Sequence, residues 1–360
     1  MTDLITRLTN PNIAELAPYE SARRLYAGGQ DWLNANESPY SNPYLLDDSK
    51  LNRYPACQPT DVVENYARYS KVETNQVLVT RGADEGIELL IRAFCQPGKS
   101  NIMICPPTYG MYAISAETCN VGIVKVPQLA DFSLDVEAMK AKADNVNVVF
   151  VCSPNNPTGN LVAREQIEAT LDFFTDKAIV AVDEAYIEFA FDTNWSSALA
   201  KYPHLVILRT LSKAFALAGL RCGFTLASEA VITTLLKVIA PYPIPEPVAQ
   251  IAAQALTEDT VSRMQTQVSV IAAERKTLVD ALQSFSDVEL VGDQQANFVL
   301  FRTPKKDELM NFLVENGLLI RDQSKQLNLE NCLRISIGSP EQNLRLLNLM
   351  NTFYDSLERA

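Results

Sequence analysis

Several short apolar runs of this 360-residue sequence are followed by residues that can do chemistry. The runs are typical of strands, and the stretches that follow them are RGADE (81–85), PPTY (106–109), SPNNPTG (153–159), DEAY (183–186) and TLSK (210–213). Arg221 lies eight residues after Lys213. Each stretch alone has an ordinary structural explanation, such as a tight turn, a helix cap or a surface charge. Together they offer an amine, a carboxylate, amides, hydroxyls, aromatic rings and a guanidinium.

One kind of ligand would use all of these groups: an aromatic cofactor that carries a phosphate, a ring nitrogen, a ring hydroxyl and an aldehyde. Pyridoxal phosphate has this set. A lysine such as Lys213 binds the aldehyde as a Schiff base, and a carboxylate such as Asp183 keeps the ring nitrogen protonated so that the ring accepts electrons. An aromatic side chain can stack on the ring. Backbone amides at a helix N-terminus and an arginine can hold the phosphate.

The same runs predict a sheet that brings these stretches together, because ligands bind beyond the carboxyl ends of strands in α/β proteins. Helices are expected over 82–94, where Ile87, Leu90, Ile91 and Phe94 share one face, and over 163–174. The apolar run after Lys213 also predicts a helix, packed beneath the ligand. Strands are expected over 76–80, 101–105, 145–152, 178–182, 204–208 and 220–227. Near-continuous apolar strands that alternate with helices indicate a mostly parallel sheet covered on both faces.

The pattern changes after residue 240. The proline-rich PYPIPEP (241–247) precedes a long helical region from Val248 to Leu282, and mixed strands and helices follow. The chain length also favours one large domain and a smaller one. We therefore predict a large domain over 36–260, a small C-terminal α+β domain over 261–360, and an N-terminal segment, 1–35, that joins the small domain.

Composition excludes several classes of protein. A net charge of −12 argues against a nucleic-acid-binding surface, which needs a basic face. No run of about 18 apolar residues predicts a membrane span, and MTDLITRLTN lacks the apolar core of a signal peptide. Seven cysteines are dispersed without a CxxC pair, which favours reduced thiols and a cytoplasmic protein. The single histidine, His204, rules out a multi-histidine metal site, so no metal is expected.

The motifs resemble those of the fold-type-I pyridoxal-phosphate aminotransferases and, more narrowly, of the histidinol-phosphate aminotransferase family. They run in family order over almost the whole chain: LNANESPY (33–40), RYP (53–55), TRGADEGIELLIRAF (80–94), SPNNPTG, VDEAYIEF (182–189), RTLSKAFALAGLRCGF (209–224), ANFVLFR (296–302) and LRISIG (333–338). The resemblance implies a large domain with a mostly parallel seven-stranded sheet flanked by helices, plus a smaller α+β domain.

The resemblance also implies roles around the cofactor ring. Lys213 would be the Schiff-base lysine and would move protons, and Asp183 would pair with the ring nitrogen. Tyr109 would stack on the ring. Asn156 and Tyr186 would bind the ring hydroxyl.

Other matched positions would bind phosphate or substrate. The cofactor phosphate would be held by the backbone amides of Ala83 and Asp84 together with the side chains of Thr210, Ser212 and Arg221. Tyr54 would reach that phosphate from the second subunit of a homodimer. The substrate would be bound by Arg334, Arg321, Tyr19 and Asn156.

The implied reaction is transamination between histidinol phosphate and 2-oxoglutarate, which gives imidazole acetol phosphate and glutamate. Three alternatives stay open on the same scaffold. They are an aromatic amino-acid aminotransferase, a pyridoxal-phosphate-dependent decarboxylase of a phosphorylated amino acid, and an inactive ligand-sensing module.

Overall fold

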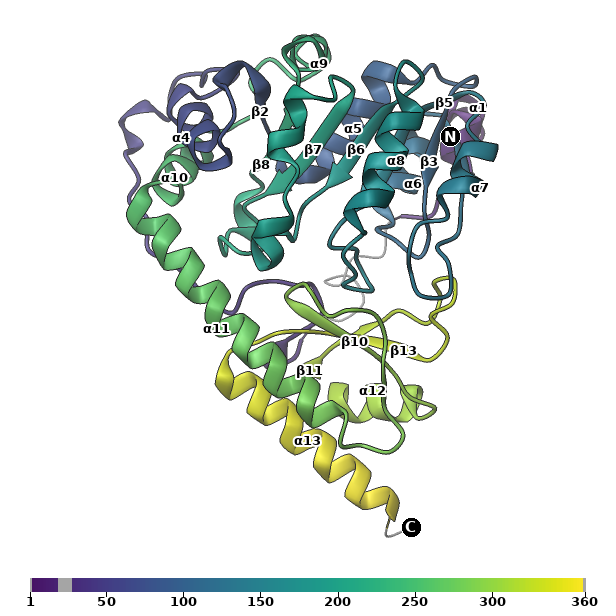
Figure 1. The fold of residues 1–360 in the computed structure, drawn as a ribbon. Helices are drawn as coiled ribbons and strands as arrows, with labels where there is room; N and C mark the ends of the chain where they lie inside the picture. Colours follow the sequence, from purple (N-terminus) through teal and green to yellow (C-terminus); the bar gives the residue numbers. More distant parts are fainter. Residues whose placement is uncertain (1, 19–27, 359–360) are drawn as a thin grey trace.

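The computed structural model describes residues 2–18 and 28–358, and in this part of the chain seven strands form one sheet (Figure 1). Its order is β2-β8-β7-β6-β5-β3-β4. Neighbours pair in parallel except at β8, which is antiparallel to both β2 and β7. The strands are β2 (Val77–Thr80), β3 (Asn101–Ile104), β4 (Gly122–Lys125), β5 (Val146–Cys152), β6 (Ile179–Asp183), β7 (Leu205–Thr210) and β8 (Gly223–Ala227). The predicted α/β class with a mostly parallel seven-stranded sheet is confirmed.

Successive side chains of each strand face two different helical layers, because side chains alternate across a strand. On β7, Leu205 and Ile207 belong to one apolar core, and Val206 and Leu208 belong to another. The first core includes residues of α4 (Thr60–Ser70), α7 (Val136–Ala141), α8 (Arg164–Phe174) and α10 (Glu246–Ala255). The second includes residues of α5 (Gly82–Phe94), α6 (Met111–Thr118) and α9 (Glu229–Leu235). Both faces of the sheet are therefore buried, as its apolar strands require.

Helix α5 follows from the pattern of its sequence. Ile87, Leu90 and Ile91 are fully buried and lie on one face of the helix. Its first turn carries Asp84 and Glu85, which are favourable beside the positive end of the helix dipole. The helix predicted over 82–94 is thus confirmed, and it places its N-terminus at the carboxyl end of β2.

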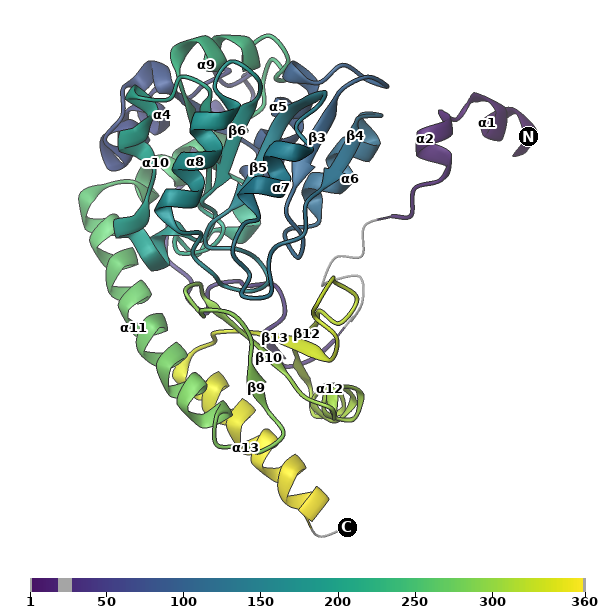
Figure 2. The same ribbon diagram turned by 45° about the vertical axis from the view of Figure 1, so that its right-hand side comes forward.

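The smaller part of the molecule is built around a second sheet in the order β12-β13-β10-β9, whose strands are labelled in Figure 2. Its strands are β9 (Glu289–Leu290), β10 (Phe298–Arg302), β12 (Arg321–Asp322) and β13 (Cys332–Ser336). Three helices contribute to its core: α11 (Glu258–Leu282), α12 (Lys306–Glu315) and α13 (Pro340–Glu358). Helix α11 runs from the larger part to the smaller one in both views (Figures 1 and 2).

The N-terminal region contacts both parts. Strand β1 (Asp31–Trp32) pairs in parallel with β11 (Leu318–Leu319) of the smaller part. Helices α1 (Thr2–Leu8) and α2 (Pro11–Ala14) lie to one side of the larger part (Figure 2), where the Asn12 amide donates to the Glu117 carbonyl, 2.9 Å away. The remaining short elements are the 3₁₀ helices η1 (Asp48–Lys50), η2 (Thr74–Gln76), η3 (Ile187–Thr193), η4 (Ser196–Ala200) and η5 (Ala218–Leu220).

One further helical prediction is confirmed and another is wrong. The helical region predicted from Val248 to Leu282 consists of two helices, since α10 ends at Ala255 and α11 begins at Glu258. The run after Lys213 is not a regular helix but a series of turns that ends in η5. The reason is topological: β8 returns antiparallel beside β7, and the Leu211 amide donates to the Cys222 carbonyl at 3.0 Å. Ala214 and Phe215 of this run are buried within a closed loop, with Leu217 and Leu220 half-buried, so the hydrophobicity of the run does not reflect a helix face.

A buried ion pair lies where β6 and β7 end. Arg209 is 0% exposed, and its guanidinium lies 2.7 Å from a carboxylate oxygen of Glu184. The guanidinium also donates to the hydroxyls of Ser196 (2.8 Å) and Ser70 (3.3 Å), and the other Glu184 oxygen accepts from the Trp195 amide (2.7 Å). Each charge is therefore paired and hydrogen-bonded, which buried charges require.

We predict that Arg209→Met lowers the free energy of unfolding by about 3–5 kcal/mol, because it leaves the Glu184 carboxylate buried without its counter-charge. Urea titration of the purified protein measures the loss. Lys276→Met is the matched control, since the Lys276–Asp280 pair is 2.6 Å apart but exposed, and it should cost less than about 1 kcal/mol. Equal losses in the two variants would contradict the assignment.

Candidate active site

A cavity of about 410 Å³ lies at the carboxyl ends of the parallel strands, where the larger part meets the smaller one. Every residue predicted to bind a cofactor or substrate lines it except Tyr54 and Tyr19. Those brought together are Ala83, Asp84, Tyr109, Asn156, Asp183, Tyr186, Thr210, Ser212, Lys213, Arg221, Arg321 and Arg334. The cavity therefore collects residues from both sheets and from the loops after five strands.

Lys213 follows β7 and projects its amine into this cavity. The amine donates to the Ala35 carbonyl at 3.1 Å and lies 5.6 Å from the centre of the Tyr186 ring. Burial, with the nearby positive charge of Arg334, lowers the pKa of Lys213 from 10.5 to about 8. A much larger fraction of this lysine is therefore an unprotonated, nucleophilic amine at neutral pH than for an exposed lysine.

Asp183 is the last residue of β6 and is 2% exposed. One carboxylate oxygen accepts the Tyr112 hydroxyl at 2.6 Å, and the other accepts the Ala185 amide at 3.0 Å. Burial raises the pKa of Asp183 from 3.8 to about 6, although these two hydrogen bonds oppose that rise. The carboxylate is thus positioned to receive a positive partner from the cavity.

The N-terminus of α5 forms the opposite wall. Gly82 has φ of 77°, which favours glycine, and a Cβ atom added to Gly223 would lie 2.4 Å from the Gly82 carbonyl carbon. This close approach keeps the start of α5 against β8. The first amides of a helix have no partner within the helix, and the helix dipole favours an anion there.

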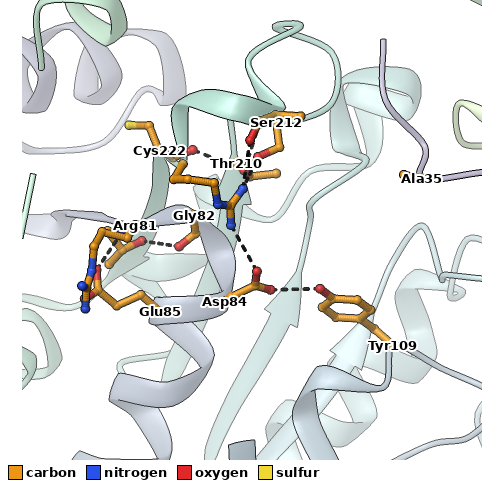
Figure 3. A network of polar contacts seen from close by, with 12 residues as sticks. Ala35, Arg81, Gly82, Asp84, Glu85, Tyr109, Thr210, Ser212 and Cys222 are labelled. Atoms are coloured by element: carbon orange, nitrogen blue, oxygen red, sulfur yellow. Dashed lines mark hydrogen bonds and ion pairs between the residues drawn. The ribbon is translucent and has the colours of Figure 1, made fainter. Parts of the chain in front are cut away.

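Side chains complete this anion-binding end (Figure 3). The Arg221 guanidinium donates to the Ser212 hydroxyl at 3.3 Å and pairs with the Asp84 carboxylate at 3.2 Å. Thr210 donates to the Ser212 hydroxyl at 2.9 Å, and Tyr109 donates to the other Asp84 oxygen at 3.0 Å. Hydroxyls, amides and a guanidinium so arranged suit a phosphate.

The other side of the cavity carries a pair of arginines. Arg321 on β12 lies opposite Arg334 on β13 in the antiparallel register, so the two side chains share one face of the small sheet. Arg334 is 6% exposed and donates to the Asn156 side-chain oxygen (2.5 Å) and the Asn34 carbonyl (3.1 Å). Two guanidiniums on one wall favour an anionic group of a ligand.

Asn155 and Asn156 have different roles in SPNNPTG. Asn155 holds the loop: it donates to the Pro107 carbonyl and the Thr158 hydroxyl, each at 2.9 Å. Asn156 lines the cavity instead, beside Tyr186, whose hydroxyl accepts from Asn36 at 2.9 Å.

Two predicted residues lie elsewhere. Tyr54 is 81% exposed and stacks on Tyr242 at 4.4 Å between ring centroids, away from the residues of this cavity. Tyr19 lies outside the described residues. The predicted contributions of both therefore stay predictions.

Sequence reasoning missed three contacts that shape the site. Tyr112 contacts Asp183, Asn36 contacts Tyr186, and the Ala35 carbonyl contacts Lys213. LNANESPY was a visible signal for the last two, although none of its residues was given a role. Tyr112 had no signal, because a tyrosine on a helix between apolar neighbours is typical of an ordinary core residue.

Other chemistries find little support in the described part of the chain. No cluster of histidine, cysteine and carboxylate side chains suitable for a metal occurs there. His204 contacts the Leu171 carbonyl at 3.0 Å and does not line the cavity. All seven cysteines are free, as predicted. Among the described helices, none is both long and apolar enough to cross a membrane.

Comparisons with known proteins agree with this geometry. The family model described as Aminotransferase class I and II matches residues 26–349. Histidinol-phosphate aminotransferase of Pseudoalteromonas atlantica is 60% identical over 358 residues, covering 98% of this chain and 96% of that protein. The histidinol-phosphate aminotransferase structure from Clostridium acetobutylicum has a TM-score of 0.82 at 23% identity, covering 91% of this chain and 100% of that chain. The structure from Sinorhizobium meliloti, in complex with pyridoxal-5'-phosphate, has a TM-score of 0.82 at 20% identity, covering 96% and 98%.

The fold is therefore that of a class I and II aminotransferase, the family whose model matches most of the chain. Within that class, the chain belongs to the histidinol-phosphate aminotransferase family. The resemblance inferred from the motifs is confirmed, and the structural likenesses show that the fold is shared.

Proposed function

We propose that the chain catalyses pyridoxal-phosphate-dependent transamination between histidinol phosphate and 2-oxoglutarate, a step of histidine biosynthesis, and forms imidazole acetol phosphate and glutamate. The observation that carries the proposal is one cavity that holds Lys213 and Asp183 together with Arg321 and Arg334. The names of the relatives support the choice of substrate.

The donor set of the cavity fits pyridoxal phosphate. Lys213 offers an amine of lowered pKa to the aldehyde. The contacts described for Asp183 come from neutral donors, Tyr112 and the Ala185 amide, so a protonated ring nitrogen would supply the counter-charge. The start of α5, with Thr210, Ser212 and Arg221, offers a cradle for the phosphate, to which Ala83 and Asp84 contribute backbone amides.

The remaining cavity residues orient the ring. Tyr109 offers an aromatic face, since it lies at the mouth of the sheet and its hydroxyl is held by Asp84. Asn156 and Tyr186 offer an amide and a hydroxyl to the ring hydroxyl. Their positions are held by Arg334 and Asn36 respectively.

When bound, pyridoxal phosphate supplies an aldehyde that takes up the amino group and a ring that withdraws electrons from the substrate carbon. Lys213 would hold that aldehyde until the substrate's amino group displaces it, and the freed Nζ would then accept the proton from the substrate carbon that bears the amino group. The same Nζ delivers the proton to the carbon that was the aldehyde carbon. Asp183 stabilises a proton on the ring nitrogen throughout.

Arg321 and Arg334 explain how one site accepts two unlike substrates. Histidinol phosphate carries a phosphate and no carboxylate, whereas 2-oxoglutarate and glutamate carry carboxylates. A guanidinium binds either anion through the same pair of N–H groups. Arg334 is held by Asn156 and the Asn34 carbonyl, so it would keep its orientation in both half-reactions. Tyr19 would assist with the substrate phosphate.

We also propose that the chain works as a cytoplasmic homodimer. Large apolar side chains near Tyr54 are strongly exposed in the single chain: Leu45 (83%), Leu46 (58%), Leu51 (55%), Tyr54 (81%) and Tyr242 (51%). A second copy would cover such a surface, and a symmetric pair is the commonest arrangement. Tyr54 would then reach the cofactor phosphate in the partner's cavity. The seven free cysteines support a reducing compartment.

A panel of amino donors with 2-oxoglutarate tests the function. We expect histidinol phosphate to exceed both histidinol and phenylalanine in kcat/KM by about 10²-fold or more, because each lacks the phosphate that two arginines bind. Arg321→Gln should narrow that ratio. Preference for phenylalanine would identify an aromatic aminotransferase, and carbon dioxide released from a phosphorylated amino acid would identify a decarboxylase. Bound cofactor without any transamination would identify a sensing module.

Replacing the lysine tests its assigned role. Lys213→Ala should lower kcat by about 10²–10⁴-fold or more, because it removes the amine that would carry the proton, and should abolish covalent attachment of pyridoxal phosphate. Borohydride reduction followed by peptide mapping should label Lys213 in the parent protein. Lys237→Ala is the control, since Lys237 is exposed, and it should keep normal turnover and labelling. Normal turnover by the Lys213→Ala variant would show that Lys213 is not the lysine that binds the cofactor and moves the proton.

Subunit mixing tests the placement of Tyr54. Tyr54→Ala and Lys213→Ala are each expected to be poorly active as homodimers. After unfolding and refolding together, they should regain activity, because one cavity of the mixed dimer combines an intact Lys213 with the partner's intact tyrosine. Tyr54→Ala mixed with the double variant should gain nothing. Absence of recovery in the first mixture would place Tyr54 within its own subunit's site or outside it.

A further inference from the structure

Tyr112 occupies a rigid position beside the cavity. It lies in the first turn of α6 and is 0% exposed. Its ring stacks on Phe150, with centroids 4.8 Å apart and planes 7° apart, and it meets the Tyr109 ring edge-on at 5.7 Å. With the ring held by these contacts, the hydroxyl points toward the carboxylate of Asp183. Packing this close allows the ring little freedom.

The hydrogen bond to Asp183 has a defined donor. Burial, with the negative charge of Asp183, holds the pKa of Tyr112 well above its usual value of 10. The phenol therefore keeps its proton and donates it to the Asp183 oxygen 2.6 Å away. A donor of this kind stabilises the ionised carboxylate more than the protonated one. It also fixes the plane of the carboxylate, because Ala185 holds the second oxygen.

We propose that Tyr112 is a positioning residue that acts through Asp183. Its hydroxyl keeps the Asp183 carboxylate ionised and turned toward the cofactor ring nitrogen, so that the proton shared by this pair stays on the ring. This inference rests on the proposed function, since it concerns the group that Asp183 would bind.

The groups around Asp183 explain why such a donor matters. The carboxylates of Asp84 and Glu184 both disfavour a negative charge on Asp183. The charge of Glu184 is paired with Arg209 on the other face of the sheet. The Cys152 thiol and the Tyr186 phenol also face this region, and burial raises the pKa of each, so both stay neutral. Tyr112 and the Ala185 amide are the donors that the structure describes against these effects.

The influence of Tyr112 on the Asp183 carboxyl can be measured in the cofactor-free protein, through the pH dependence of its stability. The carboxyl pKa of Asp183 is raised in the folded chain, from 3.8 to about 6. This group therefore stabilises the fold fully below pH 3.8, and the stabilisation is lost as the pH rises from 3.8 to about 6. Removal of the Tyr112 donor raises the folded pKa further, so the loss extends to higher pH.

The experiment compares unfolding by urea, from pH 5 to pH 8, in a cycle of Tyr112→Phe and Asp183→Asn in the cofactor-free protein. The difference between chains with and without the Asp183→Asn substitution reports the titration of this one carboxyl. We expect Tyr112→Phe to raise the midpoint of the Asp183 titration by about one pH unit, which corresponds to the free energy of one hydrogen bond to a charged group. Phenylalanine keeps the stacking on Phe150, so the fold should survive.

Tyr202→Phe is the matched control. Tyr202 is also buried, and its hydroxyl donates to Asp172 at 3.0 Å; Tyr202 lies just before the start of β7, whereas Asp183 is at the end of the parallel strand β6. This variant should leave the Asp183 midpoint unchanged. If Tyr112→Phe also leaves it unchanged, and lowers stability equally at every pH, then Tyr112 only fills space and the proposal is wrong.

The loaded protein gives a second readout. Tyr112→Phe should shift the pH titration of the bound cofactor's absorbance and lower kcat by about tenfold with little change in KM, while Tyr202→Phe should do neither. The two proposals fail separately. If Tyr112→Phe shifts the Asp183 midpoint but the parent protein transaminates no donor, the proposed function is wrong and the role of Tyr112 stands. If the parent protein transaminates normally and Tyr112→Phe leaves the Asp183 midpoint unchanged, the role of Tyr112 is wrong.

Discussion

The alternation of side chains at the end of β6 is the constraint on which the site depends. Consecutive residues of a strand point to opposite faces, so the carboxylates of Asp183 and Glu184 must be accommodated in different surroundings. Glu184 is paired with Arg209 on one face. Asp183 faces the cavity on the other face of the sheet. It accepts hydrogen bonds from neutral donors only, so its negative charge can interact with a positive group in the cavity. Two buried acids in succession are accommodated because Arg209 neutralises Glu184, while two hydrogen bonds stabilise Asp183 at the edge of the cavity.

The antiparallel return of β8 beside β7 positions the other end of the cavity. It closes the loop 211–222, which carries Lys213 near one end and Arg221 near the other, so both reach one cavity. It also presses Gly223 against the backbone of Gly82 and holds the start of α5 in place. Lys213 and the start of α5 are thus both positioned by one pair of strands.

Much of this was predictable from the sequence, and the failures have physical causes. The strands and α5 were predictable because burial on both faces leaves continuous apolar runs, and burial on one face leaves a helical period. The cavity residues were predictable because they follow strand ends, and because their motifs resemble a family. The loop after Lys213 does not form the predicted helix, since the burial of Ala214 and Phe215 results from a strand pairing that hydrophobicity does not reveal. Tyr112 was missed because its contact with Asp183 joins residues 71 positions apart.

The charges of the cavity are coupled across its width. Arg334 contributes to the lowered pKa of Lys213. Arg321 on β12 lies opposite Arg334 on β13 in the small sheet. An anion bound by these arginines would offset part of their charge, and the lysine would then hold a proton more readily. By linkage, a proton on Lys213 must in turn raise the affinity of the arginines for the anion. In the proposed reaction, the substrate's anionic group and the proton that Lys213 carries are therefore energetically linked, although they occupy opposite ends of the substrate.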